Sequence, residues 1–121
     1  MATISPDNLP NKAEAKLDIR NSTTINGLAG RTKTRLQQYG FTVTNISNTQ
    51  HKNLAQTTIY DLTYGAKPAD LALLQHKTKA IIAADIPQWL ATETSQLIKQ
   101  NPNIAQPDFI LLLGLDYSNN P

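Results

Sequence analysis

Apolar and polar positions alternate along short stretches of this chain, which is the pattern of strands with one buried face. The alternation is clearest at residues 16–21 and 41–46. Residues 57–62 are rich in β-branched and aromatic side chains, and residues 80–84 are short and apolar, so both also predict strands. Phe109–Leu113 is apolar throughout, which predicts a central strand covered on both faces.

A helix is predicted between the first two strands, from about Asn26 to Tyr39. Asn26 is the expected N-cap, and Gly40 is the expected residue just after the C-terminus. At 100° per residue, six side chains fall on one arc of this helix and are expected to face the core. They are Ile25, Leu28, Ala29, Thr32, Leu36 and Tyr39.

Two further helices are predicted in the second half of the chain. Pro68 suits the first position of one, which is striped by Leu71, Leu74 and Thr78. Asp85 and Pro87 mark the start of the other, and Asn101-Pro102 ends it. Its expected buried stripe consists of Leu90, Thr94, Leu97 and Ile98.

The resulting order, β-α-β-β-α-β-α-β, predicts a single-domain α/β sandwich with a mixed sheet of four to five strands and two to three helices. The first two strands are expected to be parallel, because a helix connects them, and the strand at 109–113 is expected in the sheet interior. The folded domain is predicted over 16–117, with residues 1–15 as a linker or tail and 118–121 as a second tail.

Composition narrows the class of protein. The 121 residues contain no cysteine, which excludes disulfides, zinc-thiolate sites and thiol catalysis. No apolar run approaches the ~20 residues that span a bilayer. The net charge of +2 is unevenly placed: residues 20–79 carry eight bases and two acids, and the rest carry three bases and seven acids. This basic section can attract an anionic polymer by long-range steering, or it can be an ordinary solvated surface.

Four phrases, taken in order, resemble the C-terminal domain of LytR-type (LytR-CpsA-Psr) cell-envelope proteins. They are Asn21 with Gly27-Leu28-Ala29, Gly40-Phe41-Thr42-Val43, Thr58-Ile59-Tyr60-Asp61, and Leu113-Gly114-Leu115-Asp116-Tyr117. The resemblance extends over most of the chain, from Lys16 to Tyr117. The stretch from Asp85 to Gln106 is longer than in the family pattern, which predicts an inserted helix.

The resemblance implies a bacterial domain outside the cytoplasm, attached to the membrane through an anchor outside this segment. Such domains follow a transferase module or a simple membrane stem. The resemblance implies no catalysis and no cofactor for the domain itself. It favours a module that binds cell-wall glycan, an anionic wall polymer or an envelope protein.

The loop after the first strand is one candidate binding site. Ser22, Thr23 and Asn26 offer hydroxyl and amide groups beside Asn21, and the start of the following helix can attract an anion. Arg31 and Arg35 lie beside the buried arc and are the candidate contacts for an anionic polymer. Ordinary turn and capping chemistry uses the same residue types, so this alternative stays open.

A second candidate site lies at strand ends. Tyr60 lies on one strand, while Asp116 and Tyr117 close another, so these residues could share a rim suited to sugar recognition. The alternative is that Asp116 caps nearby amides and Tyr117 packs on the edge. Trp89, the only tryptophan, lies off the stripe of its helix and is either exposed for stacking or packed against the sheet.

Other functions have less support from the residues. His51 and His76 lack further ligands at metal-binding spacing, and neither a nucleophile elbow nor a phosphate loop is present. We therefore expect neither a metal nor catalysis. An open-sheet RNA-binding module is the main alternative, but it needs exposed aromatics on its central strands, where this chain has aliphatic residues. No nucleic acid is expected as a partner.

Overall fold

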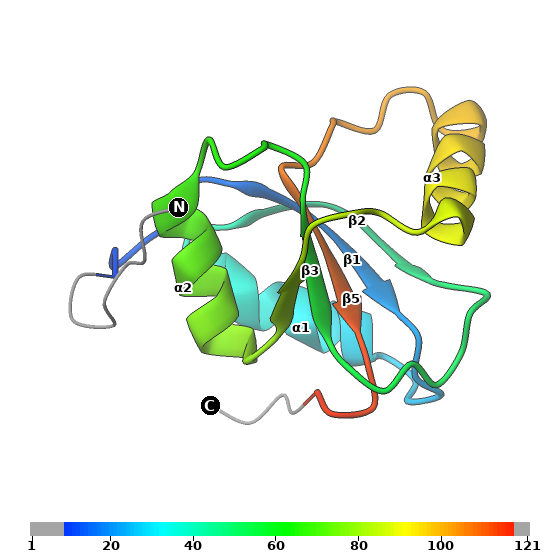
Figure 1. The fold of residues 1–121 in the computed structure, drawn as a ribbon, viewed down its shortest axis with the longest axis horizontal. Helices are drawn as coiled ribbons and strands as arrows, with labels where there is room; N and C mark the ends of the chain where they lie inside the picture. Colours follow the sequence, from blue (N-terminus) through cyan, green and yellow to red (C-terminus); the bar gives the residue numbers. More distant parts are fainter. Residues whose placement is uncertain (1–8, 118–121) are drawn as a thin grey trace.

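Five strands form one mixed sheet in the computed structural model, which describes residues 9–117. The strands are β1 (Lys16–Asn21), β2 (Thr42–Asn48), β3 (Thr58–Asp61), β4 (Ile81–Ala83) and β5 (Phe109–Leu113). The helices are α1 (Leu28–Gln37), α2 (Pro68–Thr78) and α3 (Gln88–Gln100). The chain is thus a single small α/β domain with the predicted order of elements (Figure 1).

The strand order in the sheet is β2-β1-β5-β3-β4. β1 is parallel to both β2 and β5, while β3 runs antiparallel to β5 and parallel to β4. Two predictions are confirmed: the first two strands are parallel, and the apolar strand Phe109–Leu113 is the middle strand of the sheet. Because β3 is antiparallel to β5, the C-terminal ends of the two strands lie at opposite ends of the sheet.

The main core lies between the sheet and the helices α1 and α2. Alternation in β1 points Leu17 and Ile19 into it, and neither side chain is exposed. The other large side chains of this core come from the helices and the central strands: Leu28, Leu36, Leu71, Leu73, Leu74, Ile59, Phe109, Leu111 and Leu113. This face of the sheet is therefore almost entirely apolar, as a permanently covered face should be.

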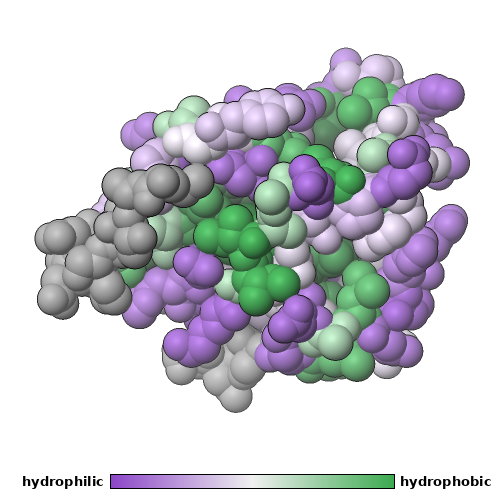
Figure 2. Space-filling view, in the orientation of Figure 1, coloured by the Kyte–Doolittle hydropathy of each residue, from purple (hydrophilic) through white to green (hydrophobic). Residues whose placement is uncertain are grey.

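The opposite face is covered by α3 and is much more mixed in character. Leu90 is the only fully buried side chain of α3, and it packs with Tyr60, Ile110 and Leu112. In Figure 1, α3 lies at the upper right and α1 lies behind the sheet. On the surface seen from this side, hydrophobic side chains gather near the centre and hydrophilic ones surround them (Figure 2). The longer segment noted in the sequence therefore forms a helix over an otherwise open sheet face.

The start of α1 differs from the expectation. The N-cap position is Gly27, at φ 78°, and no side chain caps the helix, so Asn26 is not the N-cap. Ile25, expected in the buried arc, is 52% exposed because it precedes this left-handed turn. At the other end α1 stops at Gln37 with Gln38 as C-cap, so Gly40 lies in the following turn and not directly after the helix as expected. Gly40 has φ 97°, and a Cβ there would lie 2.3 Å from the Ala13 carbonyl oxygen. Only glycine fits such an approach.

Part of the stretch that the sequence assigns to a linker packs against the domain. Ala13 and Ala15 are buried in the main core, and the Ala13 amide donates to the Tyr39 carbonyl at 2.7 Å. The carboxylate of Asp70 accepts the amides of Glu14 and Ala15 at 3.0 and 2.9 Å. The folded domain thus begins before Lys16. The rest of the two predicted tails, 1–8 and 118–121, lies outside the described residues.

Asp108 links the segment before β5 to two other parts of the fold, and it makes stability depend on pH. Its carboxylate accepts the Lys67 ammonium and the Lys16 amide, both at 2.8 Å. Burial alone would raise the pKa of Asp108, but these hydrogen bonds outweigh it and lower the pKa below the usual range. A lowered folded-state pKa adds stability above the unfolded-state pKa, and this stability is lost as pH falls through the folded-state value.

We expect Asp108→Asn to remove this acid-sensitive contribution, which is about 1 kcal/mol or less for a pair this close to solvent. In thermal melts between pH 7 and about pH 3, the original protein should lose more stability than the variant. Parallel losses in the two proteins would show that other carboxylates cause the acid sensitivity.

Candidate functional site

The loop after β1 is held by its own side chains. The Asn21 carboxamide oxygen accepts the Thr23 amide and hydroxyl at 2.9 and 2.7 Å, and the Asn21 amide group donates to the Ile25 carbonyl. The Ser22 hydroxyl donates to the Leu113 carbonyl at 2.7 Å. Asn21, Ser22 and Thr23 are each less than 5% exposed. The turn chemistry that the sequence left as an alternative accounts for these contacts.

The two arginines of α1 lie in different surroundings. Arg31 is exposed and donates to the Asn26 carbonyl at 3.1 Å. Arg35 instead donates to the Lys77 carbonyl at 2.8 Å and to the Tyr117 hydroxyl at 3.3 Å. The expectation that both flank the helix as free surface charges is therefore wrong for Arg35, because it bridges α1, α2 and the segment after β5.

The residues proposed for a shared rim do not meet. Tyr60 is 7% exposed beneath α3, and this burial raises its pKa. Tyr117 packs against the other core, on the side of α1 and α2. The antiparallel pairing places Tyr60 opposite Ile110, near the start of β5, whereas Asp116 and Tyr117 follow its end. The prediction of a shared rim is thus wrong, because the C-terminal ends of β3 and β5 lie at opposite ends of the sheet.

Asp116 has a structural contact that explains the closing Gly-x-Asp phrase. Its carboxylate accepts the amide and the hydroxyl of Thr57 at 2.7 and 2.8 Å, just before β3 begins. The Gly114 amide donates to the same hydroxyl at 3.0 Å, and a Cβ on Gly114 would lie 2.6 Å from the Gln56 carbonyl carbon. The end of β5 is thereby fastened to the start of β3.

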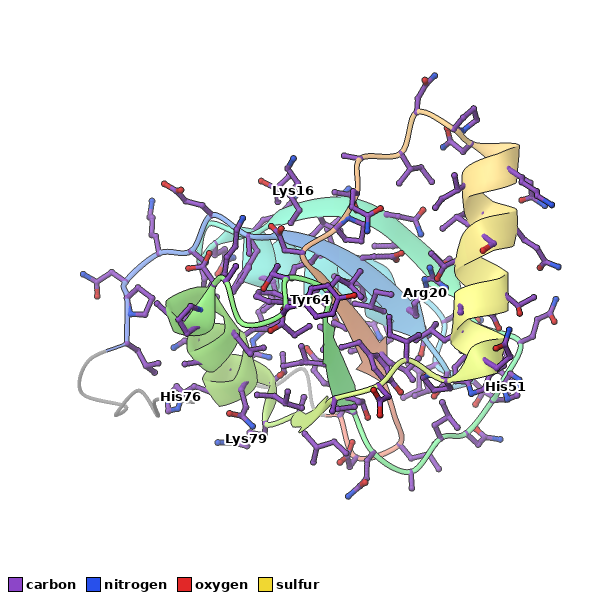
Figure 3. The ribbon with its side chains drawn as sticks, turned by 45° about the horizontal axis from the view of Figure 1, so that its top comes forward. Lys16, Arg20, His51, Tyr64, His76 and Lys79 are labelled. Atoms are coloured by element: carbon purple, nitrogen blue, oxygen red, sulfur yellow. The ribbon has the colours of Figure 1, made fainter. Side chains whose placement is uncertain are left out.

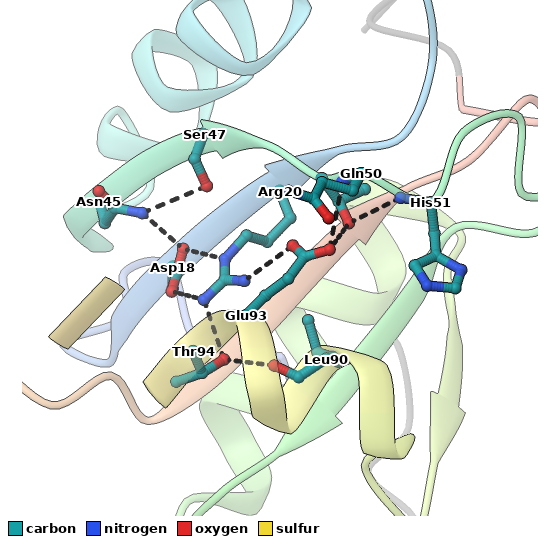
Figure 4. Close-up of polar contacts among 10 residues, drawn as sticks. Asp18, Arg20, Asn45, Ser47, Gln50, His51, Leu90, Glu93 and Thr94 are labelled. Atoms are coloured by element: carbon teal, nitrogen blue, oxygen red, sulfur yellow. Dashed lines mark hydrogen bonds and ion pairs between the residues drawn. The ribbon is translucent and has the colours of Figure 1, made fainter. Parts of the chain in front are cut away.

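A buried ion network lies on the α3 side of β1 (Figure 4). Alternation in β1 places Asp18 and Arg20 on the face opposite Leu17 and Ile19, and they are only 3% and 2% exposed. The Arg20 guanidinium donates to both carboxylate oxygens of Asp18, at 3.0 and 2.8 Å. Such two-bond pairing is the strongest geometry for these groups, and it compensates the loss of hydration.

The helix α3 completes this network. The Thr94 hydroxyl accepts a third bond from Arg20 at 3.1 Å, and the Glu93 carboxylate lies 3.7 Å from the remaining guanidinium nitrogen. Glu93 also accepts the Thr49 hydroxyl at 2.7 Å and the Gln50 amide at 3.2 Å. One cation thus stands between two carboxylates, so the network has a residual negative charge.

A hollow of about 250 Å³ opens above this network, between α3 and the end of β2. We call it the amide hollow, because carboxamides form its rim. Its lining consists of Arg20, Ser47, Asn48, Gln50, Glu93, Gln96, Leu97 and Gln100. The four rim carboxamides are exposed, and their side chains make no hydrogen bond with another residue of the described chain. They are therefore available to a ligand in solution.

An aromatic pair is formed by two residues close in sequence to the lining of the amide hollow. The rings of His51 and Trp89 stack with centroids 4.1 Å apart and an interplanar angle of 22°. His51 follows Gln50 directly, and Trp89 lies one helical turn before Glu93. Figure 3 shows His51 at the end of α3 and Arg20 beside the middle of this helix. Trp89 is half-buried, so the position of this residue lies between the two alternatives that the sequence left open.

A second hollow, of about 260 Å³, lies on the other face of β2. We call it the helix hollow, because the start of α1 forms one wall. Its lining consists of Asn21, Gly27, Ala29, Gly30, Ile46, Ser47 and Asn48. Of the residues that the sequence selected for binding, Asn21 alone lines either hollow. Gly30 leaves open space above it, since nothing beyond its chain neighbours and the backbone of its own helix lies within 4 Å of a Cβ placed there.

The amide hollow was not predicted from the sequence, although a signal for it was present. The alternating β1 stretch carries Asp18 and Arg20 on its non-core face, and such polar residues usually indicate a solvated face. The glutamines of α3 repeat at positions 96 and 100, a spacing that places them on one face of a helix. What the sequence could not supply was the position of α3 over the polar half of the sheet.

The comparison with protein families decides the family of the chain. Residues 14–117 match the family described as the LytR cell envelope-related transcriptional attenuator, LytR_C. The chain belongs to the LytR_C family. Searches of curated proteins and of solved structures find no match. The resemblance noted in the sequence is thus confirmed, and the LytR_C domain here is associated with the cell envelope.

Two observations on this LytR_C domain concern membranes and metals. Within residues 9–117, none of the helices combines the length and the apolar character needed to cross a membrane. In the same residues, no group of three or more histidine, aspartate or glutamate side chains is placed to hold a metal ion. Its LytR_C phrases serve the fold at Gly40, Gly114 and Asp116, where glycine permits close packing and the carboxylate joins two strands.

Proposed function

We propose that this LytR_C domain is a non-catalytic binding module outside the cytoplasm, and that a neutral stretch of cell-wall glycan binds in the amide hollow. The observation that carries the proposal is the rim of four unpaired carboxamides above a buried ion network. Each carboxamide offers donors and an acceptor, which suits hydroxyl and acetamido groups of a sugar. The membrane anchor would lie outside this segment.

The charge of the amide hollow favours a neutral ligand over an anionic one. Asp18 and Arg20 neutralise each other, and Glu93 leaves an excess negative charge at the floor. An anionic wall polymer would be repelled there at short range. Contacts with such a polymer would instead involve the exposed Arg31, at the start of α1.

The rigidity of the amide hollow also supports a binding role. Its floor is fixed by hydrogen bonds from three elements, β1, α3 and the segment after β2. A preformed site loses little conformational entropy when a ligand binds. The stacked pair of His51 and Trp89 adds flat aromatic rings, next to Gln50 and one helical turn from Glu93, of the kind on which sugar rings can pack.

Binding without catalysis is the better-supported role. The carboxylates near the hollow are committed to hydrogen bonds and an ion pair, and Asp116 is committed to Thr57. The RNA-binding alternative has less support, because Tyr60, the aromatic residue of β3, is buried beneath α3 and offers no stacking surface.

Replacing Gln96 and Gln100 together with alanine should weaken binding to purified cell wall about tenfold. Each lost carboxamide contact is worth about 0.5–1.5 kcal/mol, and a factor of ten corresponds to about 1.4 kcal/mol. Both side chains are exposed, so thermal stability should stay within about 0.5 kcal/mol of the original. The measurement is co-sedimentation of the purified domain with isolated wall over a range of wall concentrations.

Gln37→Ala is the matched control, because Gln37 is an exposed glutamine on another helix, outside both hollows. It should bind the wall as the original does. Equal binding by the double variant and the control, with both folded, would reject the amide hollow as the binding site. Turnover of wall glycan by the purified domain would reject the non-catalytic part.

A further inference from the structure

The outer edge of β2 is an unpaired strand edge of unusual composition. β2 is seven residues long and lies at one end of the sheet, and β1 is its only partner strand among the described residues. Its sequence, TVTNISN, has no charge and no proline. Proteins usually protect such edges with lysine, proline, a bulge or a very short strand. The opposite edge, β4, follows this rule, since it has three residues.

Only the first half of β2 has such protection. The register of β1 and β2 shifts between Leu17 and Asp18, so that Thr44 forms a bulge. The following four residues, Asn45–Asn48, pair regularly with β1. This half of the edge is therefore straight enough to accept another strand.

The exposed hydrogen-bonding groups on this edge can be assigned by alternation. The Thr49 amide donates to the Asn21 carbonyl at 3.1 Å, so the backbone of Thr49 faces β1. In a parallel pair, successive residues point their backbone groups to opposite sides. The amides and carbonyls of Ile46 and Asn48 therefore point outward, away from the sheet.

The helix hollow lies directly beside these outward groups. It is lined by Ile46 and Asn48 from β2 and by Ala29 and Gly30 from α1. A strand added outside β2 would send every second side chain toward this face of the sheet. The absence of a side chain on Gly30 leaves room for them.

The charge on this side of α1 is positive. On the helical wheel, Lys33 shares the flank of Ala29 and Gly30, one turn further along α1. Lys33 is half-buried and makes no ion pair within the described chain. The N-terminal end of α1 adds the positive end of the helix dipole to the helix hollow.

We propose that the outer edge of β2 binds an extended acidic peptide segment of another protein. The peptide backbone pairs with Ile46 and Asn48, and its acidic side chains face the helix hollow and Lys33. Main-chain hydrogen bonds supply affinity and the flanking hollow supplies specificity, as in other strand additions. This site uses the outer edge and the α1 face of β2, whereas the proposed glycan site lies on the α3 face, and Ser47 and Asn48 line both hollows.

Repulsion between copies of Lys33 favours an acidic peptide, and not a second copy of the chain, as the partner at the β2 edge. Two copies paired antiparallel through β2 would place one α1 beside the other on the same face of the joined sheet. The two copies of Lys33 would then approach each other across the interface, which is unfavourable. An acidic peptide satisfies the same backbone groups and also neutralises Lys33.

The test is an NMR titration of the ¹⁵N-labelled domain with two capped heptapeptides, one of alternating glutamate and threonine and one of alternating lysine and threonine. The glutamate peptide should shift the amide signals of Ile46 and Asn48. It should bind about three- to tenfold more tightly than the lysine peptide, and added salt should reduce the difference. Lys33→Glu should reverse the preference, whereas Lys79→Glu, beside β4 at the other edge, should preserve it.

Ile46→Pro removes one outward amide at an edge position that tolerates proline, and it should abolish the shifts while the fold is retained. If this variant does not fold, the reversal at Lys33 still decides the proposal. Equal binding of the two peptides, or no shift at Ile46 and Asn48, would overturn it. So would broadening of these signals with protein concentration alone, because a second copy would then occupy the edge.

Discussion

Replacing Leu111 with aspartate is expected to prevent the domain from folding. Leu111 is the middle residue of β5, the middle strand, where it lies between Ile19 of β1 and Ile59 of β3. All three side chains are fully buried. An unpaired carboxylate there would cost several kcal/mol, against a total stability of about 5–15 kcal/mol for a typical domain. Circular dichroism and the NMR spectrum of the purified variant would report the loss.

The matched control is Leu115→Asp, only four residues away. Leu115 is 59% exposed, so the same chemical change should alter the free energy of unfolding by about 0.5 kcal/mol or less. A Leu111→Asp variant with a cooperative transition near that of the original protein would contradict the architecture. Such a result would mean that β5 does not lie in the sheet interior.

Arg20→Met is expected to cost about 3–5 kcal/mol, because it leaves the Asp18 carboxylate buried without its cation. Among residues 9–117, Asp18 would keep only the amide group of Asn45, which donates to it at 3.2 Å. Chemical denaturation of the variant and the original would give the difference in the free energy of unfolding. A smaller loss, below about 1 kcal/mol, would mean that water reaches Asp18.

The double variant Asp18→Leu with Arg20→Met separates burial of a charge from general disruption. With both charges removed, the free energy of unfolding should recover to within about 1–2 kcal/mol of the original, since apolar side chains can replace a buried ion pair. If the double variant is as unstable as Arg20→Met alone, loss of shape rather than an unpaired charge would explain the single substitution.

The fold could be predicted because its strands and helices carry simple periodic patterns. Leu17 and Ile19 alternate with polar residues, Phe109–Leu113 has no polar position, and Pro68 begins a helix, as the structure confirms. Details that depend on single turns could not be predicted in this way. The left-handed conformation of Gly27 moved the start of α1 and exposed Ile25.

The candidate site was harder to predict because it depends on tertiary contacts. Asp18 and Glu93 are 75 positions apart and come together only where α3 crosses the sheet. Polar residues in a turn attract notice in a sequence, but Asn21, Ser22 and Thr23 use their polar groups within their own loop. Arg35 likewise was predicted as a surface charge from its place on the helical wheel. In the structure its guanidinium instead donates to Tyr117 and Lys77.

An NMR titration of the labelled domain with soluble, uncharged fragments of wall glycan tests whether glycan binds in the amide hollow. Signals of Asn48, Gln50, Gln96 and Gln100, which include their side-chain amide groups, should shift together and saturate. Signals of Tyr60 and Asp116 should stay unchanged, because the first is buried beneath α3 and the second is bonded to Thr57. Saturable shifts confined to other residues, or no shifts at saturating fragment concentrations, would contradict glycan binding in the amide hollow.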